Sequence, residues 1–196
     1  PGVMERLGLS VESLMAENPR LIYCAISGYG QDGPMAQRPA YDHVVQAVSG
    51  MMVINSDNRG EPWRIGFPMI DYVAGQSAAF AISSALFQRE RTGRGQVIDV
   101  AMLDTAVAIM APALASYLQG ITPPPRSGGL AASGSPFSGM FETTEGVLAL
   151  AANAPSQAQS VAREIGRDDL LADVRFKDWA RNDDCLLYTS DAADER

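Results

Sequence analysis

The sequence contains few of the residues that mark several common classes of protein. Two cysteines among 196 residues exclude a small disulfide-stabilised scaffold and are typical of a reduced, cytosolic protein. A net charge of −8 argues against a nucleic-acid or anionic-membrane partner. No apolar run approaches the roughly 20 residues that span a bilayer, and the first residues do not form a signal peptide. We therefore expect a cytoplasmic protein with no membrane and no nucleic-acid partner.

The two ends of the sequence suggest a fragment. The chain begins without Met, in what reads as the middle of a connection. Residues 185–195, CLLYTSDAADE, resemble the translation of a sequencing-library adapter, a contaminant of metagenomic reads. We therefore expect the native sequence to stop near Asp184, with residues 185–196 as a non-native tail.

The first half of the chain predicts an α/β fold. A short helix over Leu9–Asn18, capped by Ser10, precedes the continuous apolar run Leu21–Ser27. Such a run is typical of a strand buried on both faces of a parallel sheet. Three consecutive prolines predict a stiff linker over 121–127, which separates residues 1–120 from a second domain over 128–184.

A glycine-rich segment follows the predicted strand. Gly28–Gly33 formally matches G-x-G-x-x-G, but a dinucleotide site requires a helix to open inside that motif. Pro34 and Pro39 prevent such a helix, and no acidic residue ends a second strand about 20 residues later. We therefore predict a loop whose glycines let a ligand approach the backbone, without a nicotinamide or flavin.

A helix is predicted over Tyr41–Val53, and it contains Asp42 and the only histidine, His43. On a continuous helix His43 lies about 200° around the axis from Tyr41, so the two side chains should face different ways. A lone His at a helix start is more often a surface or capping residue than a catalytic one. The inward positions of this helix are predicted to be Val44, Val45, Val48 and Met51.

The stretch Gly66–Leu103 is the part of the sequence around which we place the other predicted elements. Pro68 restrains the chain before it, Asp71 stands where a helix should begin, and Tyr72–Arg91 contains no proline. Gly93 suits the left-handed position after the helix, and a β pattern follows it. The predicted order is therefore loop, helix, turn and strand.

Asp71 has two interpretations, and they are compatible. The first is an N-cap that accepts hydrogen bonds from the amides of Val73 and Ala74. The second is a nucleophile at the positive end of the helix dipole, at the mouth of an α/β sheet. Spacing alone favours the cap.

The remaining elements are predicted from local patterns. Leu103–Leu118 reads as a helix kinked at Pro112, and residues 140–152 read as a hairpin. A helix over Ser156–Ile165, capped by Gly166, precedes a short helical piece over Asp168–Phe176.

Four stretches together resemble one family, the class III CoA-transferases of the CaiB/BaiF type, which are related to α-methylacyl-CoA racemases. The resemblance covers essentially Pro1–Asp184, and its carriers are PRLIYCAISGYGQDGP, AYDHVVQAVSGMM, PMIDYVAGQSAAFAISSALFQRERTGRGQVIDVAMLD and SPFSGMFETTEGVLALAAN. It implies part of a Rossmann-like large domain followed by part of a small α+β domain. It also implies an interlocked homodimer whose subunit is about twice this length, so we expect this fragment alone to be inactive.

The resemblance implies a reaction and its residues. Asp71 matches the nucleophile that accepts an acyl group and then coenzyme A, and Asp42 matches an assisting carboxylate. The acyl-CoA and a small carboxylic acid are substrates, and neither a metal nor a permanently bound cofactor is implied. Coenzyme A binding is assigned to Gly28, Tyr29, Gly30, Arg38 and Tyr41. A loop at Gly128, Gly129 and Gly134 is expected to bind the oxyanions.

Two alternatives remain open. The related racemases need a His followed directly by an Asp, but here Tyr41 precedes Asp42 and His43 comes two places late. A non-catalytic scaffold of the same fold is the other alternative. The intact Asp71 and the turn Thr92–Gln96 favour a transferase over both.

Overall fold

The computed structural model describes residues 1–56, 61–120, 135–174 and 176. The chain divides into two compact units, Pro1–Asn55 with Pro62–Pro123 and Ser56–Glu61 with Pro124–Arg196. The predicted linker over 121–127 and the predicted tail over 185–196 lie outside the described residues. No helix in the described ranges is both long and apolar enough to cross a membrane.

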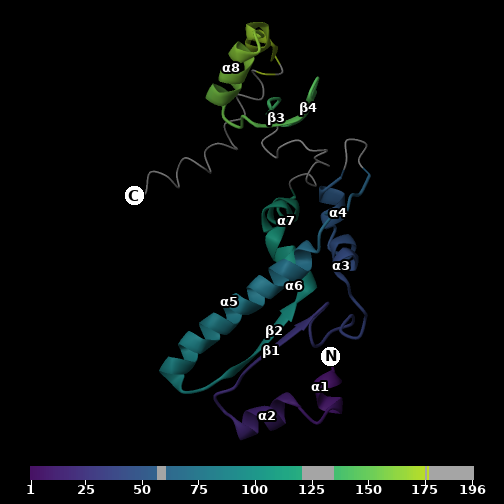
Figure 1. The fold of residues 1–196 in the computed structure, drawn as a ribbon, viewed down its shortest axis with the longest axis vertical. Coiled ribbons are helices and arrows are strands. Elements are labelled where there is room, and N and C mark those ends of the chain that lie inside the picture. Colours follow the sequence, from purple (N-terminus) through teal and green to yellow (C-terminus); the bar gives the residue numbers. More distant parts are fainter. Residues whose placement is uncertain (57–60, 121–134, 175, 177–196) are drawn as a thin grey trace. The chain divides into compact units, whose positions relative to one another are not determined.

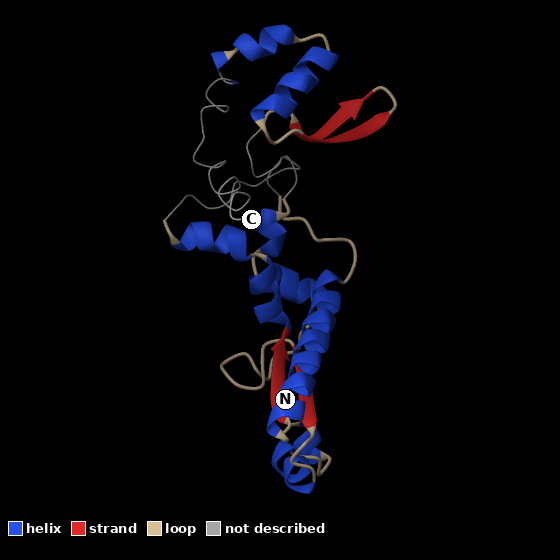
Figure 2. Cartoon of the chain, turned by 90° about the vertical axis from the view of Figure 1, so that its left-hand side faces the viewer, coloured by secondary structure: helices blue, strands red, loops and turns tan. Residues whose placement is uncertain are grey.

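The first unit is built on two parallel strands and one long helix (Figures 1 and 2). Strand β1, Ile22–Ser27, pairs with β2, Gln96–Ala101, in a parallel register from Ile22↔Gln96 to Ser27↔Ala101. Helix α5, Met69–Thr92, contacts both strands. Because the helix connects two parallel strands in this way, the predicted α/β fold is confirmed.

The sequence of α5 explains how it packs. Ala74, Ala78 and Ala85 are buried in one cluster with Ile98 and Val100 of β2, so small side chains let the helix lie close to the sheet. The helix ends as predicted: Gly93 is left-handed, with φ 72°, and its amide donates to the Arg89 carbonyl at 2.8 Å.

The prediction that the first strand is buried on both faces is wrong for the described chain. β1 has no fully buried residue, and the Ile26 side chain is 54% exposed. On β2, Val97 is 51% exposed and alternates with the buried Ile98, so it lies on the face away from α5. Burial on both faces needs cover on both faces, and α5 covers only one.

The helix predicted over Tyr41–Val53 is divided into α3, Asp42–Val48, and α4, Met51–Ile54. Gly50 separates them with φ 82°. Val45 and Met51 are buried as predicted, but Val48, the last residue of α3, is 49% exposed, so that part of the prediction is wrong.

The flanking helices follow their local signals. In α2, Val11–Glu17, the Ser10 hydroxyl oxygen accepts a hydrogen bond from the Ser13 amide at 3.2 Å, which confirms the predicted cap. The predicted kink at Pro112 is a complete break between α6, Met102–Ile109, and α7, Ala111–Leu118. A four-residue helix, α1, spans Val3–Arg6.

The second unit contains the predicted hairpin. Strand β3, Ser138–Thr143, pairs antiparallel with β4, Gly146–Ala151. Helix α8, Pro155–Glu164, and the 3₁₀ helix η1, Asp168–Ala172, follow (Figure 1). The buried cluster of this unit consists of Phe137, Ala152, Ala158, Ala162 and Phe176.

Candidate active site

Asp71 is the third residue of α5, because the helix begins at Met69 rather than at Asp71. The prediction that Asp71 is the N-cap is therefore wrong: Pro68 occupies that position and has no side-chain acceptor. The Asp71 side chain is exposed and has no hydrogen-bond or ion-pair partner among the described residues. No described side chain or amide therefore competes with a ligand for the Asp71 carboxylate.

The cap of α5 comes from another helix. Asp42, the first residue of α3, accepts hydrogen bonds at Oδ2 from the amides of Ile70, at 2.6 Å, and of Asp71, at 3.2 Å. These are the second and third amides of the helix, which a local cap would normally satisfy. Asp42 therefore replaces the acceptor that Pro68 lacks and stabilises the turn that carries Asp71.

A buried glutamine holds Asp42 in place. The Gln46 side chain is fully buried, and its Nε2 donates to Asp42 Oδ1 at 2.6 Å. Its Oε1 accepts the Ile65 amide at 3.0 Å, so Gln46 also fixes the segment that leads into α5. Sequence analysis missed Gln46, although its position four residues after Asp42 places both side chains on one helix face.

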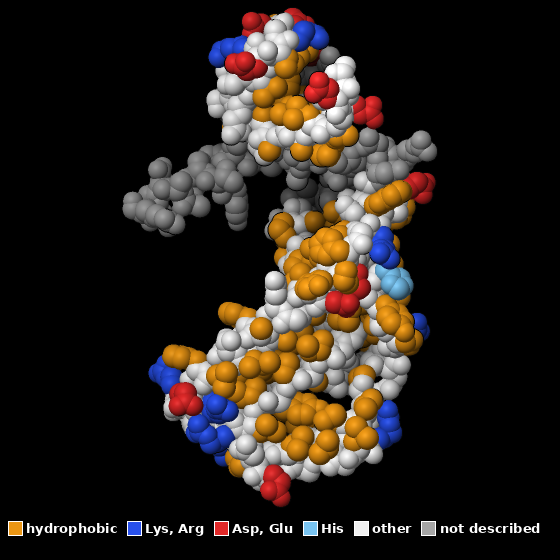
Figure 3. Space-filling view, viewed as in Figure 1, with side chains coloured by type: hydrophobic (Ala, Val, Ile, Leu, Met, Phe, Trp, Pro, Cys, Tyr) orange, Lys and Arg blue, Asp and Glu red, His pale blue; other side chains and the backbone are white. Residues whose placement is uncertain are grey.

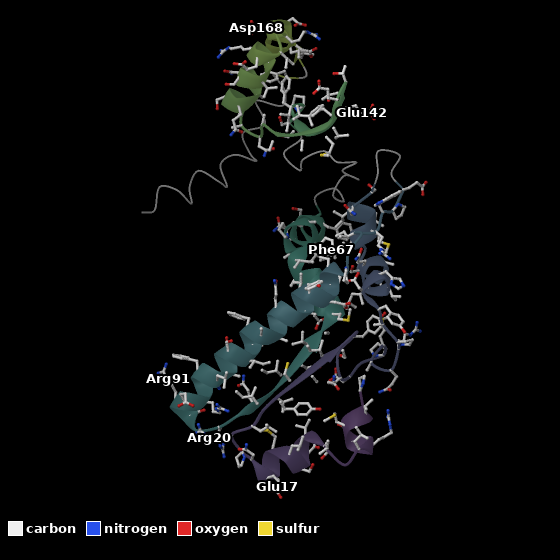
Figure 4. All side chains as sticks on the ribbon, viewed as in Figure 1. Glu17, Arg20, Phe67, Arg91, Glu142 and Asp168 are labelled. Carbon is white, nitrogen blue, oxygen red and sulfur yellow. The ribbon has the colours of Figure 1, made fainter. Side chains whose placement is uncertain are left out.

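Asp71 lines an open depression of about 540 Å³ on the outer side of α5. Its lining residues are Pro68, Asp71, Tyr72, Gly75, Gln76 and Ala79. The depression lies toward the N-terminal end of α5, the end at which Figure 4 labels Phe67, whereas Arg91 marks the opposite end. Apolar side chains follow the outer side of the helix (Figure 3), where Tyr72, Phe80 and Phe87 are all more than half exposed.

The glycine-rich loop Gly28–Gly33 contains no helix, as predicted, and two of its backbone amides are already hydrogen-bonded within the chain. The Gly30 amide donates to Ser27 Oγ at 3.0 Å, and the Gln31 amide donates to Asp99 Oδ2 at 2.9 Å. A β-carbon on Gly28 would lie 2.2 Å from that of Ala40. Within the described chain, Gly28 allows close packing, and coenzyme A binding by Gly28 and Gly30 stays a prediction.

The remaining residues assigned to coenzyme A differ in exposure. Arg38 and Tyr41 are exposed, whereas Tyr29 is partly buried. The Tyr41 and His43 rings are stacked, with 6.0 Å between their centroids and 7° between their planes. The prediction that these side chains face different ways is wrong, because Tyr41 precedes α3 in an extended conformation and helical geometry does not apply to it.

The remaining candidate groups are the predicted oxyanion loop, possible metal ligands and the thiol of Cys24. Gly128, Gly129 and Gly134, predicted to bind oxyanions, lie outside the described residues. The structure shows no cluster of three His, Cys, Asp or Glu side chains suited to a metal within the ranges it describes. Cys24 is a free thiol on β1, and burial, with a further contribution from Asp99, raises its pKa above the ordinary value.

The chain matches known proteins over most of its length. Residues 1–185 match the model of CoA-transferase family III. The chain is 38% identical to an acetyl-CoA:oxalate CoA-transferase of Acetobacter aceti, over 95% of this chain and 49% of that protein. It is 36% identical to a succinyl-CoA:glutarate CoA-transferase of Mus musculus, over 90% of this chain and 40% of that protein.

Solved structures agree with these matches. A CaiB/BaiF family protein from Brucella suis aligns with a TM-score of 0.75 and 34% identity, over 90% of this chain and 46% of that one. The chain thus spans about half the length of the curated relatives and solved structures that it matches. On the match to the family model and on the shared fold, this chain belongs to CoA-transferase family III.

Proposed function

We propose that the full-length protein containing this chain transfers coenzyme A from an acyl-CoA donor to a carboxylic acid, with Asp71 as the nucleophile. The observation that carries the proposal is the contrast between its two candidate carboxylates. Asp42 accepts three hydrogen bonds, whereas Asp71 has no described partner and lines a depression open to solvent. The relatives that are named as CoA-transferases support the same class of reaction.

The first half of the reaction moves coenzyme A onto the enzyme. The Asp71 carboxylate attacks the thioester carbonyl, the carbon–sulfur bond breaks, and a mixed anhydride and the CoA thiolate form. The thiolate then attacks the aspartyl carbonyl of the anhydride. The donor acid leaves as a carboxylate, and an aspartyl-CoA thioester remains on Asp71.

The second half repeats these steps in reverse. The acceptor carboxylate attacks the aspartyl thioester and expels the CoA thiolate, which gives a second mixed anhydride. The thiolate attacks the acceptor carbonyl of that anhydride, releasing the new acyl-CoA and the free Asp71 carboxylate. Each intermediate stays close in energy to a thioester, so the transfer needs no ATP.

The other predicted residues take supporting parts in this proposal. Asp42 is a positioning residue, since its oxygens face the α5 amides and Gln46. Gly128, Gly129 and Gly134 supply oxyanion donors, which tetrahedral intermediates require. Arg38, Tyr29 and Tyr41 contact coenzyme A, and Gly28 and Gly30 shape the loop beside them.

The rest of the assembly is also proposed. The complete polypeptide is a cytoplasmic, interlocked homodimer, with a large domain that includes residues 1–120, a linker over 121–127 and a small domain that includes residues 128–184. Because the chain spans about half the length of its relatives, it is inactive by itself.

A racemase is the second candidate, and one observation favours it. His43 stacks on Tyr41, so an imidazole lies next to the residue that occupies the histidine position of the racemases. A racemase exchanges the α-proton of a 2-methylacyl-CoA with solvent, whereas a transferase moves coenzyme A between acids. Deuterium incorporation from heavy water without coenzyme A transfer would therefore favour the racemase, and neither activity would favour a scaffold.

The proposed role of Asp71 is tested in the full-length protein with Asp71→Asn, which keeps the shape of the side chain but removes its nucleophilic charge. We expect coenzyme A transfer to fall by about 10³-fold or more while the melting temperature is unchanged. Asp104→Asn is the matched control, because Asp104 is exposed in the first turn of α6. Retained transfer by Asp71→Asn would refute the proposal.

A further inference from the structure

We propose that Gly75 is a specificity-determining residue, because its missing side chain leaves the space in which the acyl end of the thioester meets Asp71. The inference rests on the proposed role of Asp71 as nucleophile. It goes further by assigning the occupant of the depression on α5 and the residue that limits the size of that occupant.

Neither the backbone nor the packing explains a glycine at position 75. Gly75 lies inside α5, away from both ends, where glycine is less favourable than alanine. It is not among the positive-φ glycines, so its conformation is open to any residue. A β-carbon built on Gly75 would meet no atom within 4 Å, whereas one on Gly28 would collide with Ala40. The described chain therefore tolerates a larger residue at position 75.

The depression arises from two adjacent rows of side chains at four-residue spacing. One row contains Asp71, Gly75 and Ala79, and the other contains Pro68, Tyr72 and Gln76. Residues four apart lie on one face of a helix, so each row runs along α5. Beyond Asp71 the first row has only the smallest side chains, and the second has large ones. The small residues thus form the floor of the depression, and Tyr72 and Gln76 form one side.

Position 75 controls access to the Asp71 carboxylate in particular. Helical side chains lean toward the N-terminus of their helix, so a side chain at position 75 would project toward Asp71, one turn earlier. A glycine there leaves the approach to the carboxylate open. Asp71, Tyr72 and Gln76 are the lining residues with polar side chains, and of these the Asp71 carboxylate is the group that attacks a thioester.

The acyl end of the substrate is the occupant that fits this arrangement. A nucleophile requires its electrophile within about 3–3.5 Å, and that space must stay empty until the substrate binds. Another segment of the protein packed over Gly75 would instead fill the space permanently. If the substrate fills the space, a side chain added at position 75 should leave stability unchanged or raise it. If another segment of the protein fills the space, the added side chain should lower stability.

The test uses the full-length protein and the variants Gly75→Ala and Gly75→Leu. Rates are measured with the acyl-CoA donor that gives the unmodified enzyme its highest rate and with a donor of longer acyl chain. Ser84→Ala and Ser84→Leu are matched controls, since Ser84 is exposed on the same helix outside the depression. Melting temperature is measured for every variant.

We expect Gly75→Ala to lower kcat/KM about 10-fold and Gly75→Leu more than 100-fold, with the larger losses for the longer donor. The melting temperature should stay constant or rise by about 1–4 °C, because helix propensity improves. The Ser84 variants should keep both values.

Two results would overturn the inference. The first is a kcat/KM within twofold of the unmodified enzyme for Gly75→Leu with both donors. The second is a clear fall in melting temperature for Gly75→Ala but not for Ser84→Ala, which would show that another part of the protein fills the space. If Asp71→Asn is inactive while Gly75→Leu is fully active, this inference fails and the proposed nucleophile stands. Full activity of Asp71→Asn refutes the nucleophile itself.

Discussion

The carboxylate of Asp42 accepts a hydrogen bond from the backbone amide of Asp71, with 3.2 Å between Asp42 Oδ2 and Asp71 N. The same oxygen accepts the Ile70 amide at 2.6 Å, so one side chain from α3 accepts hydrogen bonds from two of the first amides of α5. The residue proposed to attack the substrate is therefore held by a residue that lies 29 positions earlier in the sequence.

Removing this cap is expected to affect both stability and rate. In the full-length protein, Asp42→Ala leaves the amides of Ile70 and Asp71 without their acceptor. We expect the free energy of unfolding to fall by about 1–3 kcal/mol. Coenzyme A transfer should fall by about 10- to 100-fold in kcat, because a displaced Asp71 no longer meets the thioester correctly. Thermal unfolding and steady-state rates measure the two effects.

Asp104→Ala is the control for this experiment, since it removes a carboxylate from the first turn of another helix, α6. It should change stability by less than about 0.5 kcal/mol. If Asp42→Ala has normal stability but is fully inactive, Asp42 contacts the reacting atoms, and the positioning role is wrong.

Gln46→Glu is predicted to have a pH-dependent effect. The substitution replaces the amide that donates to Asp42 Oδ1 with a second carboxylate in a fully buried position. Like charges at this distance favour the protonated form, so the new group has a raised pKa in the folded state. The contribution of the introduced carboxyl group to folding stability is therefore present at low pH, where the group is protonated. It is lost as the pH rises through the raised pKa of the folded state.

We therefore expect the melting temperature of Gln46→Glu, relative to the unmodified protein, to be higher at pH 5 than at pH 8. Gln46→Met, which has a similar volume and no titratable group, should be destabilised to the same extent at both pH values. An equal deficit at both pH values for Gln46→Glu would contradict the observed contact between Gln46 and Asp42.

Gly28 offers a test that separates packing from ligand binding. A β-carbon at position 28 would lie 2.2 Å from that of Ala40, so Gly28→Ala should destabilise the protein by about 1–3 kcal/mol. Adding Ala40→Gly removes the colliding methyl group and should restore part of that loss, which a double-mutant cycle measures. Independent, additive effects of the two substitutions would show that this contact is absent.

The thiol of Cys24 provides a prediction based on charge. Burial raises its pKa, and the nearby Asp99 carboxylate raises it further. In the unfolded chain the thiol ionises first, so its contribution to stability is present below the ordinary thiol pKa of about 8.5 and is lost as pH rises through the folded value. Asp99→Asn should lower the Cys24 pKa and speed alkylation by iodoacetamide at pH 8. An unchanged rate would mean that Asp99 has no influence on the thiol.

Elements with local signals were predicted well from the sequence. Gly93 ends α5 because a glycine readily adopts the left-handed conformation, and Ser10 caps α2 with its own side chain. The hairpin β3–β4 follows from two apolar runs separated by polar residues. In each case the residues that determine the structure lie within a few positions of it, so a single sequence contains the information.

The errors arose where distant residues decide the local structure. Asp71 was predicted to cap α5, but the cap comes from Asp42, and local spacing holds no trace of that contact. His43 was predicted to face away from Tyr41 on the assumption of one continuous helix, yet Tyr41 lies outside it. The role of Asp71 as nucleophile stays a prediction. Gln46 was missed because its spacing from Asp42 shows that the two side chains share a helix face but not that this face is buried.

Trapping the covalent intermediate tests whether Asp71 is the nucleophile. Hydroxylamine is added to the full-length protein during turnover with an acyl-CoA donor, and the protein is digested and analysed by mass spectrometry. An aspartyl anhydride or thioester reacts with hydroxylamine at the aspartyl carbonyl, so we expect a hydroxamate on Asp71 and loss of activity that requires the donor. Activity that survives hydroxylamine, with an unmodified Asp71 after many turnovers, would show that Asp71 is not the nucleophile.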